Sequence, residues 1–94
     1  MLDAAELAAQ PSGKIVKVAG MVVVRQAPPT AKGHLFISLE DETGLINLIV
    51  RPDLYAVERR VLREASVLAA EGVLQRDGRA VSVLVRRVWA LGEG

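Results

Sequence analysis

The segment HLFISLEDETGLINLIVR, positions 34–51, constrains the fold of this chain more than any other part of its sequence. Apolar and polar side chains alternate on both sides of the turn DETG, as they do in two half-buried antiparallel strands. One face of this strand pair is entirely apolar and is expected to face a core. The other face should meet water, yet it carries Ile49 and Phe36, the single phenylalanine of the chain. The residues expected to face the core are Leu35, Ile37, Leu39, Ile46, Leu48 and Val50.

Three further strands are predicted on either side of this pair. Residues 14–26, KIVKVAGMVVVRQ, indicate a long strand in which Gly20 marks a bend or a bulge. The segment APPTAKG that follows is expected to be a loop, because prolines cannot pair within a sheet. Residues 66–75 and 80–91 predict the last two strands, and the RDGR between them carries the Asp-Gly signal of a tight hairpin turn.

Two helices are predicted. Residues 52–64, PDLYAVERRVLRE, indicate one helix with apolar residues at helical spacing. Near the N-terminus, Asp3 stands three residues before Glu6, a capping-box pattern that predicts a short helix ending before Pro11. The apolar positions of the longer helix are Leu54, Val57, Val61 and Leu62.

The order of three strands, a helix and two strands indicates an all-β protein. It is the order of the five-stranded Greek-key barrel called the OB-fold (oligonucleotide/oligosaccharide-binding), in which a helix between strands three and four closes one end. Gly20 and Gly72 fit the bends that a closed sheet needs. We expect a helical lead-in at 1–13, the barrel at 14–91 and a frayed C-terminus at 92–94. A ferredoxin-like fold would need a second core helix, which the lead-in supplies in the wrong place.

The composition excludes several classes of protein. Ninety-four residues, 51% of them hydrophobic, predict one small globular domain. Cysteine is absent, which excludes disulfides and thiolate metal sites and fits a reducing, cytoplasmic location. No apolar run reaches the roughly 18 residues of a membrane span, and the N-terminus lacks the basic leader of a signal peptide. We expect no membrane association, no cofactor and a monomer as the isolated domain.

Catalysis has little support in the sequence. The chain has one histidine, and its single carboxylate cluster is EDE at 40–42. Such clusters can hold metal ions, but acidic residues in a tight turn before Gly44 are typical of solvation and local hydrogen bonding. We therefore expect no catalytic residue and no metal site, and the isolated domain is predicted not to be an enzyme.

Binding is better supported, because the face of strands two and three is the ligand face of an OB-fold. An exposed aromatic residue there can stack on unpaired bases, which assigns Phe36 the central position. Ser38 and Asn47 can bond to base edges, Ile49 adds an apolar patch, and His34 offers a second stacking plane.

Basic residues are expected to surround this face and to bind phosphates. If Val22 and Val24 point inward, the alternation of the first strand turns Arg25 outward beside the same face. Bland explanations remain open: another domain could cover Phe36, charged residues are common at hairpin tips, and a GC-rich genome also raises arginine content. The predicted basic residues are Arg25, Lys32, Arg51, Arg76 and Arg79.

Residues 18–50, VAGMVVVRQAPPTAKGHLFISLEDETGLINLIV, resemble a known family. They are similar to the C-terminal OB domain of bacterial DNA polymerase III alpha subunits, above all to the error-prone group used in mutagenic repair. The likeness continues through the predicted helix and EGVLQRDG, and covers about 80 residues. It implies a module that contacts single-stranded template DNA, with other domains of a DNA polymerase active in replication and repair as its neighbours and the catalytic groups outside this chain.

The resemblance also implies individual contacts and three departures. Ala27 stands where the family often has arginine, Pro29 where it often has glycine, and Arg51 where the error-prone group often has tryptophan. The first loop is therefore expected to be stiffer and less basic, and the contact at Arg51 to rely on charge. The DNA-contacting residues that the resemblance implies are Arg25, Lys32, Phe36, Ser38, Asn47 and Arg51.

Two alternatives are kept. Aminoacyl-tRNA synthetases of the aspartate group carry an anticodon-binding OB domain with a similar G-x-V…F-x-x-L-x-D-x-x-G skeleton. A barrel face can also dock on protein, either a neighbouring domain or an accessory repair protein. The net charge of +1 does not separate these functions.

Overall fold

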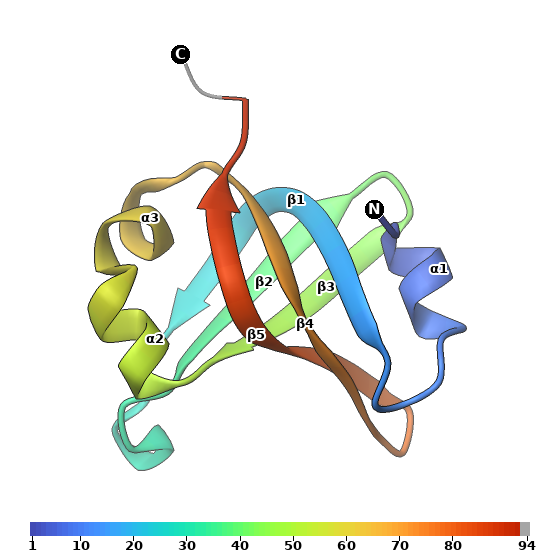
Figure 1. Ribbon diagram of the computed structural model, residues 1–94, viewed down its shortest axis with the longest axis horizontal. Coiled ribbons are helices and arrows are strands. Elements are labelled where there is room, and N and C mark those ends of the chain that lie inside the picture. Colours follow the sequence, from blue (N-terminus) through green and yellow to red (C-terminus); the bar gives the residue numbers. More distant parts are fainter. Residues whose placement is uncertain (93–94) are drawn as a thin grey trace.

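The computed structural model describes residues 1–92, and these form a closed barrel of five strands (Figure 1). Each strand is hydrogen-bonded to its neighbours in the order β1-β2-β3-β5-β4, and β4 pairs with β1 to close the sheet. All neighbouring strands are antiparallel except β3 and β5, which run parallel. The predicted five-stranded OB-fold is therefore confirmed. The strands are β1 (Ile15–Gln26), β2 (Leu35–Asp41), β3 (Gly44–Val50), β4 (Val67–Asp77) and β5 (Ala80–Ala90).

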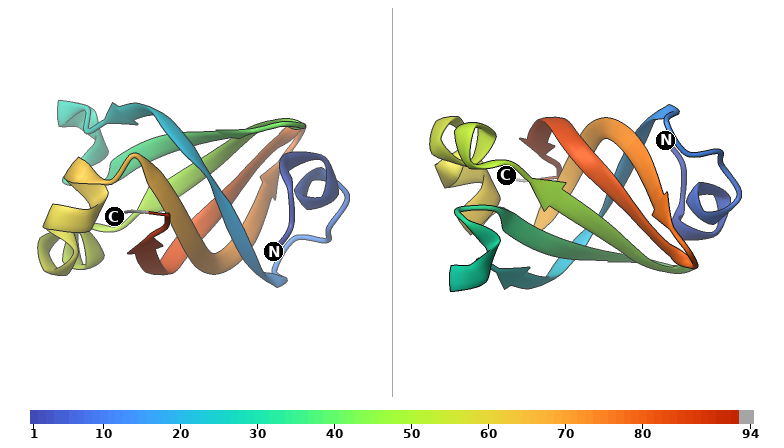
Figure 2. Two further views of the ribbon diagram at one scale, coloured as in Figure 1. Left: turned by 90° about the horizontal axis from the view of Figure 1, so that it is seen from above. Right: turned by 90° about the horizontal axis from the view of Figure 1, so that it is seen from below.

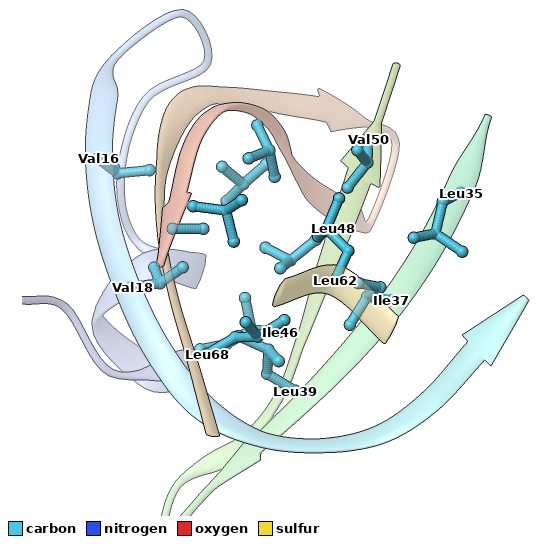
Figure 3. Close-up of a cluster of buried hydrophobic side chains, with 14 of the residues drawn as sticks. Val16, Val18, Leu35, Ile37, Leu39, Ile46, Leu48, Val50, Leu62 and Leu68 are labelled. Carbon is cyan, nitrogen blue, oxygen red and sulfur yellow. The ribbon is translucent and has the colours of Figure 1, made fainter. Parts of the chain in front are cut away.

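The barrel interior is filled by the alternating apolar residues of its strands, as Figure 3 shows. All six residues of the segment 34–51 that were expected to face the core are buried. None of the described residues with a polar or charged side chain is buried, so the interior is held together by aliphatic packing alone.

The segment between β3 and β4 forms two short helices, where a single helix was predicted. They are α2 (Pro52–Val57) and α3 (Arg59–Glu64), and the chain leaves helical geometry at Glu58, with φ −106° and ψ 25°. Leu62 is fully buried at the end of the barrel, whereas Val57 is 79% exposed. The four apolar positions predicted for one helix therefore do not form one buried face, because helical geometry is interrupted at Glu58, between Val57 and Val61.

Two glycines allow strands to approach each other more closely than a Cβ atom would permit. A Cβ on Gly72 would lie 2.1 Å from the carbonyl oxygen of Leu84, and one on Gly20 would lie 2.8 Å from that of Glu40. The register of β4 against β5 shifts at Gly72 and leaves Arg86 as an extra, unpaired residue of β5. The register shift at Gly72 is the irregularity predicted there, whereas the pairing of β1 with β4 is continuous through Gly20.

The N-terminal helix α1 (Ala4–Ala8) packs against the barrel at the β2–β3 turn (Figure 2). Asp3 and Glu6 form the predicted capping box, and Leu7 is buried in the core. The backbone N–H of Ala4 donates to Asp41 Oδ2 at 2.9 Å, and that of Ala5 donates to Thr43 Oγ1 at 3.0 Å. The lead-in is thus attached to the barrel by hydrogen bonds as well as by packing.

Asp41, the central residue of EDE, is a hydrogen-bond acceptor within this junction. Its Oδ1 accepts from the hydroxyl and the backbone N–H of Thr43, both at 2.8 Å, and from the N–H of Gly44 at 3.1 Å. The Thr43 hydroxyl, together with these backbone donors, holds the pKa of the Asp41 carboxyl below its usual value. The geometry assigns Asp41 to the turn, in agreement with the structural interpretation of the cluster.

The substitution Asp41→Asn is predicted to lower stability at neutral pH and to change its pH dependence. The pKa of Asp41 is depressed in the folded state, so its contribution is complete above the unfolded pKa of about 4 and is lost as pH falls through the folded pKa. Urea unfolding from pH 7 to pH 2 should therefore show the wild type losing its advantage over the variant in acid. Glu42→Gln, in the same turn, is the matched control; a constant difference between wild type and Asp41→Asn at every pH would contradict the prediction.

No helix within residues 1–92 is long and apolar enough to cross a membrane. The frayed C-terminus was predicted at 92–94, and residues 93 and 94 lie outside the described residues.

Candidate nucleic-acid interface

Strand pairing places Phe36 in the middle of a row of side chains on the outside of the barrel. Gln26 of β1 and Ile49 of β3 lie directly opposite Phe36, and Leu84 of β5 lies beside Ile49. Residues opposite each other in a sheet share a face, so these four side chains adjoin. Phe36 is 37% exposed, which leaves part of its ring accessible to a ligand. The predicted central position of Phe36 on an exposed face matches this geometry.

A second row, more polar than the first, runs beside it. Val24, Ser38, Asn47 and Ser82 are paired across the same four strands. The Ser38 hydroxyl donates to Asn47 Oδ1 at 3.4 Å, and Asn47 Nδ2 donates to the carbonyl oxygen of Val81 at 3.5 Å. Both bonds are long, and the Asn47 side chain is exposed, so its amide remains available to a ligand. We call these two rows the outer face.

Arg25 does not point toward the outer face, and the prediction of its direction was wrong. Val22 pairs with Leu39 but Val24 pairs with Ser38, so Val23 is an extra residue that forms a β-bulge. The bulge reverses the alternation that follows it. Val24 is consequently 42% exposed on the outer face, and Arg25 pairs with the inward-facing Ile37.

The Arg25 guanidinium is instead bonded to the end of α3. Its Nε donates to the carbonyl oxygen of Leu62 at 2.7 Å, and its Nη2 donates to that of Ala65 at 2.5 Å. These carbonyls have no partner within the helix, so a cation with several donors stabilises them. Arg25 therefore connects the end of β1 to the helix that closes the barrel, and its contact with nucleic acid stays a prediction.

The two arginines of the β4–β5 hairpin have different surroundings. Arg76 Nη2 donates to the carbonyl oxygens of Ala8 and Gln10, both at 2.8 Å, and so caps the C-terminal end of α1. Arg79 occupies the two-residue turn with Gly78 and shares a pocket of about 250 Å³ with Asn47. The structure thus brings Arg79, rather than Arg76, next to the outer face.

The remaining predicted residues lie around the β1–β2 loop and the end of β3. The loop contains a 3-10 turn, η1 (Pro29–Ala31), and Lys32 follows it exposed in a left-handed conformation with φ 55°. His34 Nδ1 is 2.8 Å from the carbonyl oxygen of Ala31, so its ring helps to close the loop. Arg51 directly follows β3 and is exposed.

Sequence reasoning missed four residues of the outer face on β1 and β5, namely Val24, Gln26, Ser82 and Leu84. Val24 was assigned to the interior because the run of three valines, 22–24, hides the bulge. Ser82 and Leu84 were not considered because the contact of β5 with β3 depends on the closure of the barrel. Alternation within β5 could have shown that Ser82 and Leu84 share one face of the strand. It could not have shown that this face adjoins the strands that carry Phe36 and Ile49.

The family model described as "OB-fold nucleic acid binding domain" matches residues 16–91. The chain belongs to this family of nucleic-acid-binding OB-fold domains.

Within that class, the chain is similar to a segment of bacterial error-prone DNA polymerases. It is 51% identical over 85 residues to the error-prone DNA polymerase of Anaeromyxobacter dehalogenans strain 2CP-C, a match that covers 90% of the chain. It is 44% identical over 86 residues to that of Pseudomonas aeruginosa, covering 92% of the chain. The chain spans only about 8% of the length of either polymerase. The resemblance to the OB domain of this group is confirmed.

Solved structures with low sequence identity share the fold. Asparaginyl-tRNA synthetase from Pyrococcus horikoshii superimposes with a TM-score of 0.78 at 21% identity, covering 96% of this chain and 22% of the synthetase. The OBody AM1L10, solved bound to hen egg-white lysozyme, superimposes with a TM-score of 0.67 at 18% identity, covering 88% of this chain and 83% of the OBody. Both likenesses bear on the fold alone.

Proposed function

We propose that this domain binds single-stranded DNA on its outer face, as the template-contacting module of a bacterial error-prone DNA polymerase of the DNA polymerase III alpha type. The observation that carries the proposal is the half-exposed Phe36, flanked by Gln26 and Ile49 in the middle of an open sheet face. An aromatic ring so placed can stack on an unpaired base, a contact of roughly 1–3 kcal/mol that tolerates every base. The identity to error-prone DNA polymerases supports DNA as the ligand.

Binding by the isolated domain is expected to be weak and to depend on salt. The net charge is +1, and the guanidinium groups of Arg25 and Arg76 are already bonded to helix ends. Of the five basic residues predicted around the outer face, Lys32, Arg51 and Arg79 remain to replace the counterions of the phosphates. In a parent polymerase, adjoining domains would hold the strand as well, and a low affinity here would suffice.

A titration of the ¹⁵N-labelled chain with a short oligodeoxynucleotide, followed by NMR, tests the proposal. We expect the largest shifts at Phe36, Ser38, Asn47 and Ile49, the central residues of β2 and β3. Shifts confined to α1, α2 and α3 would contradict it. The oligoribonucleotide of the same sequence distinguishes the anticodon-binding alternative, which requires RNA to bind more tightly than DNA.

Protein docking is the second candidate, favoured by one observation on the outer face. Met21 and Leu45, which both flank Glu40 at one end of this face, are 56% and 59% exposed. Exposed apolar side chains of this size are typical of protein contacts, and the OBody shows an OB-fold scaffold bound to a protein. Docking predicts that Phe36→Ala leaves oligonucleotide shifts unchanged and disrupts assembly with the rest of the polymerase.

A further inference from the structure

A pocket of about 410 Å³ opens between α2 and β5, next to the outer face. Two arginines stand at this pocket, Arg51 directly after β3 and Arg86 on β5, and both are exposed. Besides the two arginines, the lining has one carboxylate and three apolar side chains. The lining residues are Arg51, Asp53, Leu54, Val57, Val85 and Arg86.

The two arginines of the pocket lie two residues further along the chain than the members of the Phe36 row on β3 and β5. Ile49 and Leu84 are paired in that row, Arg51 follows Ile49 by two residues, and Arg86 follows Leu84 by two. Two residues of an extended strand span roughly 7 Å, and neighbouring strands lie about 4.8 Å apart. Phe36 lies one strand from Ile49 and two strands from Leu84, so its backbone is roughly 8 Å from that of Arg51 and about 12 Å from that of Arg86, distances that one nucleotide and an extended arginine side chain can bridge. A strand with a base on Phe36 therefore has its neighbouring phosphate within reach of both arginines.

The bulge in β5 separates Arg86 from the paired residues of the strand. Glu71 pairs with Arg87 and Gly72 with Val85, so Arg86 lies between two ladder positions. Arg87 is bonded to Glu71 at 3.2 Å, whereas Arg86 forms no ion pair with any of residues 1–92. Bulges commonly redirect a side chain next to a binding site. Here the bulge leaves a permanently charged guanidinium available at the pocket.

The charges and walls of the pocket fit a phosphodiester. Two guanidiniums and the carboxylate of Asp53 give its lining a net charge of +1, which complements the single negative charge of a backbone phosphate. Guanidinium groups bind phosphate oxygens through paired N–H donors. The apolar walls, among them Val57 at 79% exposure, can cover the adjoining sugar.

We propose that Arg51 and Arg86 together hold the backbone phosphate adjacent to the nucleotide that stacks on Phe36. This inference rests on the proposed function, and it adds Arg86 and a phosphate site to the outer face. The strand would thus cross from β2 and β3 toward the junction of α2 with β5.

Fluorescence anisotropy with a labelled twelve-residue oligothymidylate tests the site in the full chain. Arg51→Gln and Arg86→Gln should each weaken binding several-fold at low salt and reduce the slope of log affinity against log salt, and the double variant should reduce it by about 0.7, the value for one phosphate on a single strand. Arg60→Gln is the matched control, because Arg60 is an exposed arginine of α3 that is not among the pocket-lining residues and is paired with Glu64. Urea unfolding of each variant monitors folding, and Arg86→Lys, which retains the charge, should keep most of the slope.

A single neutral methylphosphonate placed at successive linkages of the oligonucleotide identifies the phosphate. At one linkage, the replacement should weaken binding to the wild type but have no further effect on Arg86→Gln. Additive losses at every linkage, an unchanged salt slope, or an effect at only one of the two arginines would overturn the two-arginine site. If Phe36→Ala loses binding while both arginine variants keep the wild-type slope, the pocket fails and the proposed function stands. If the wild type binds no oligonucleotide, both fail.

Discussion

Phe36→Ala is expected to weaken binding of a short oligothymidylate about 5- to 150-fold, corresponding to the roughly 1–3 kcal/mol of a base stacked on an aromatic ring. The ring stands on the outer face rather than in the core and is 37% exposed. Its removal therefore costs mainly the cross-strand contacts with Gln26 and Ile49, each up to about 1 kcal/mol of folding stability. Anisotropy at low salt and urea unfolding, measured on the same preparation, separate the two effects.

Met21→Ala is the matched control for this loss. Met21 is an apolar residue on the same side of the barrel, 56% exposed, but it lies opposite Glu40, whose carboxylate repels phosphates. Its truncation should change affinity less than twofold. Phe36→Tyr, which keeps the ring, should bind nearly as well as the wild type. Equal losses for Phe36→Ala and Met21→Ala would show that general apolar area, rather than stacking on one ring, holds the strand.

The half of the outer face that lies on β2 and β3 could be predicted from the sequence, because alternation alone determines it. Along each strand of positions 34–51, the residues that face one side of the sheet are aliphatic, and those that face the other side are a mixture of polar and apolar types. A turn joins the two strands in register. The buried set from Leu35 to Val50 and the exposed set around Phe36 both follow from this pattern.

The part of the outer face that lies on β1 could not be predicted, because a β-bulge within residues 22–24 interrupts the alternation of inward and outward side chains. Residues 22–24 are all valine, so no polar residue marks which of them is the extra one in the bulge. One extra residue in a strand reverses, for every residue that follows it, whether the side chain points into or out of the barrel. Arg25 consequently turned from the expected outer face to the carbonyls of α3.

The surroundings of the arginines depended on tertiary structure in the same way. Sequence spacing shows which strand or loop carries an arginine, but not which unpaired carbonyls lie within reach of it. Arg76 caps α1, whose C-terminal end lies more than sixty residues away along the chain. Arg51 and Arg86 meet at one pocket only because β5 pairs with β3. The fold determines which groups a long, flexible arginine side chain contacts, whereas the pattern of aliphatic residues largely determines the fold itself.

Gly72→Ala is expected to destabilise the domain by about 3 kcal/mol or more, since overpacking against rigid groups exceeds the usual cost of an added methyl group. The new Cβ would lie 2.1 Å from the carbonyl oxygen of Leu84 and 2.9 Å from the Cα of Val85. Both are backbone atoms of β5, so no side-chain rotation can relieve the clash. The urea midpoint should fall by more than about 1 M.

Gly78→Ala measures the conformational cost of replacing a glycine where the added methyl group meets no other atom, and so separates that cost from the steric clash at Gly72. Gly78 has φ +64° with open space around its Cα, so a methyl group there meets only the strain of the left-handed conformation, about 1 kcal/mol. The two variants differ in what the methyl group contacts: nothing at the hairpin turn, and the backbone of β5 at Gly72. If Gly72→Ala were no less stable than Gly78→Ala, β4 and β5 could not approach as closely as described. The bulge that exposes Arg86 depends on that approach, so the same measurement also tests the geometry from which the phosphate site was inferred.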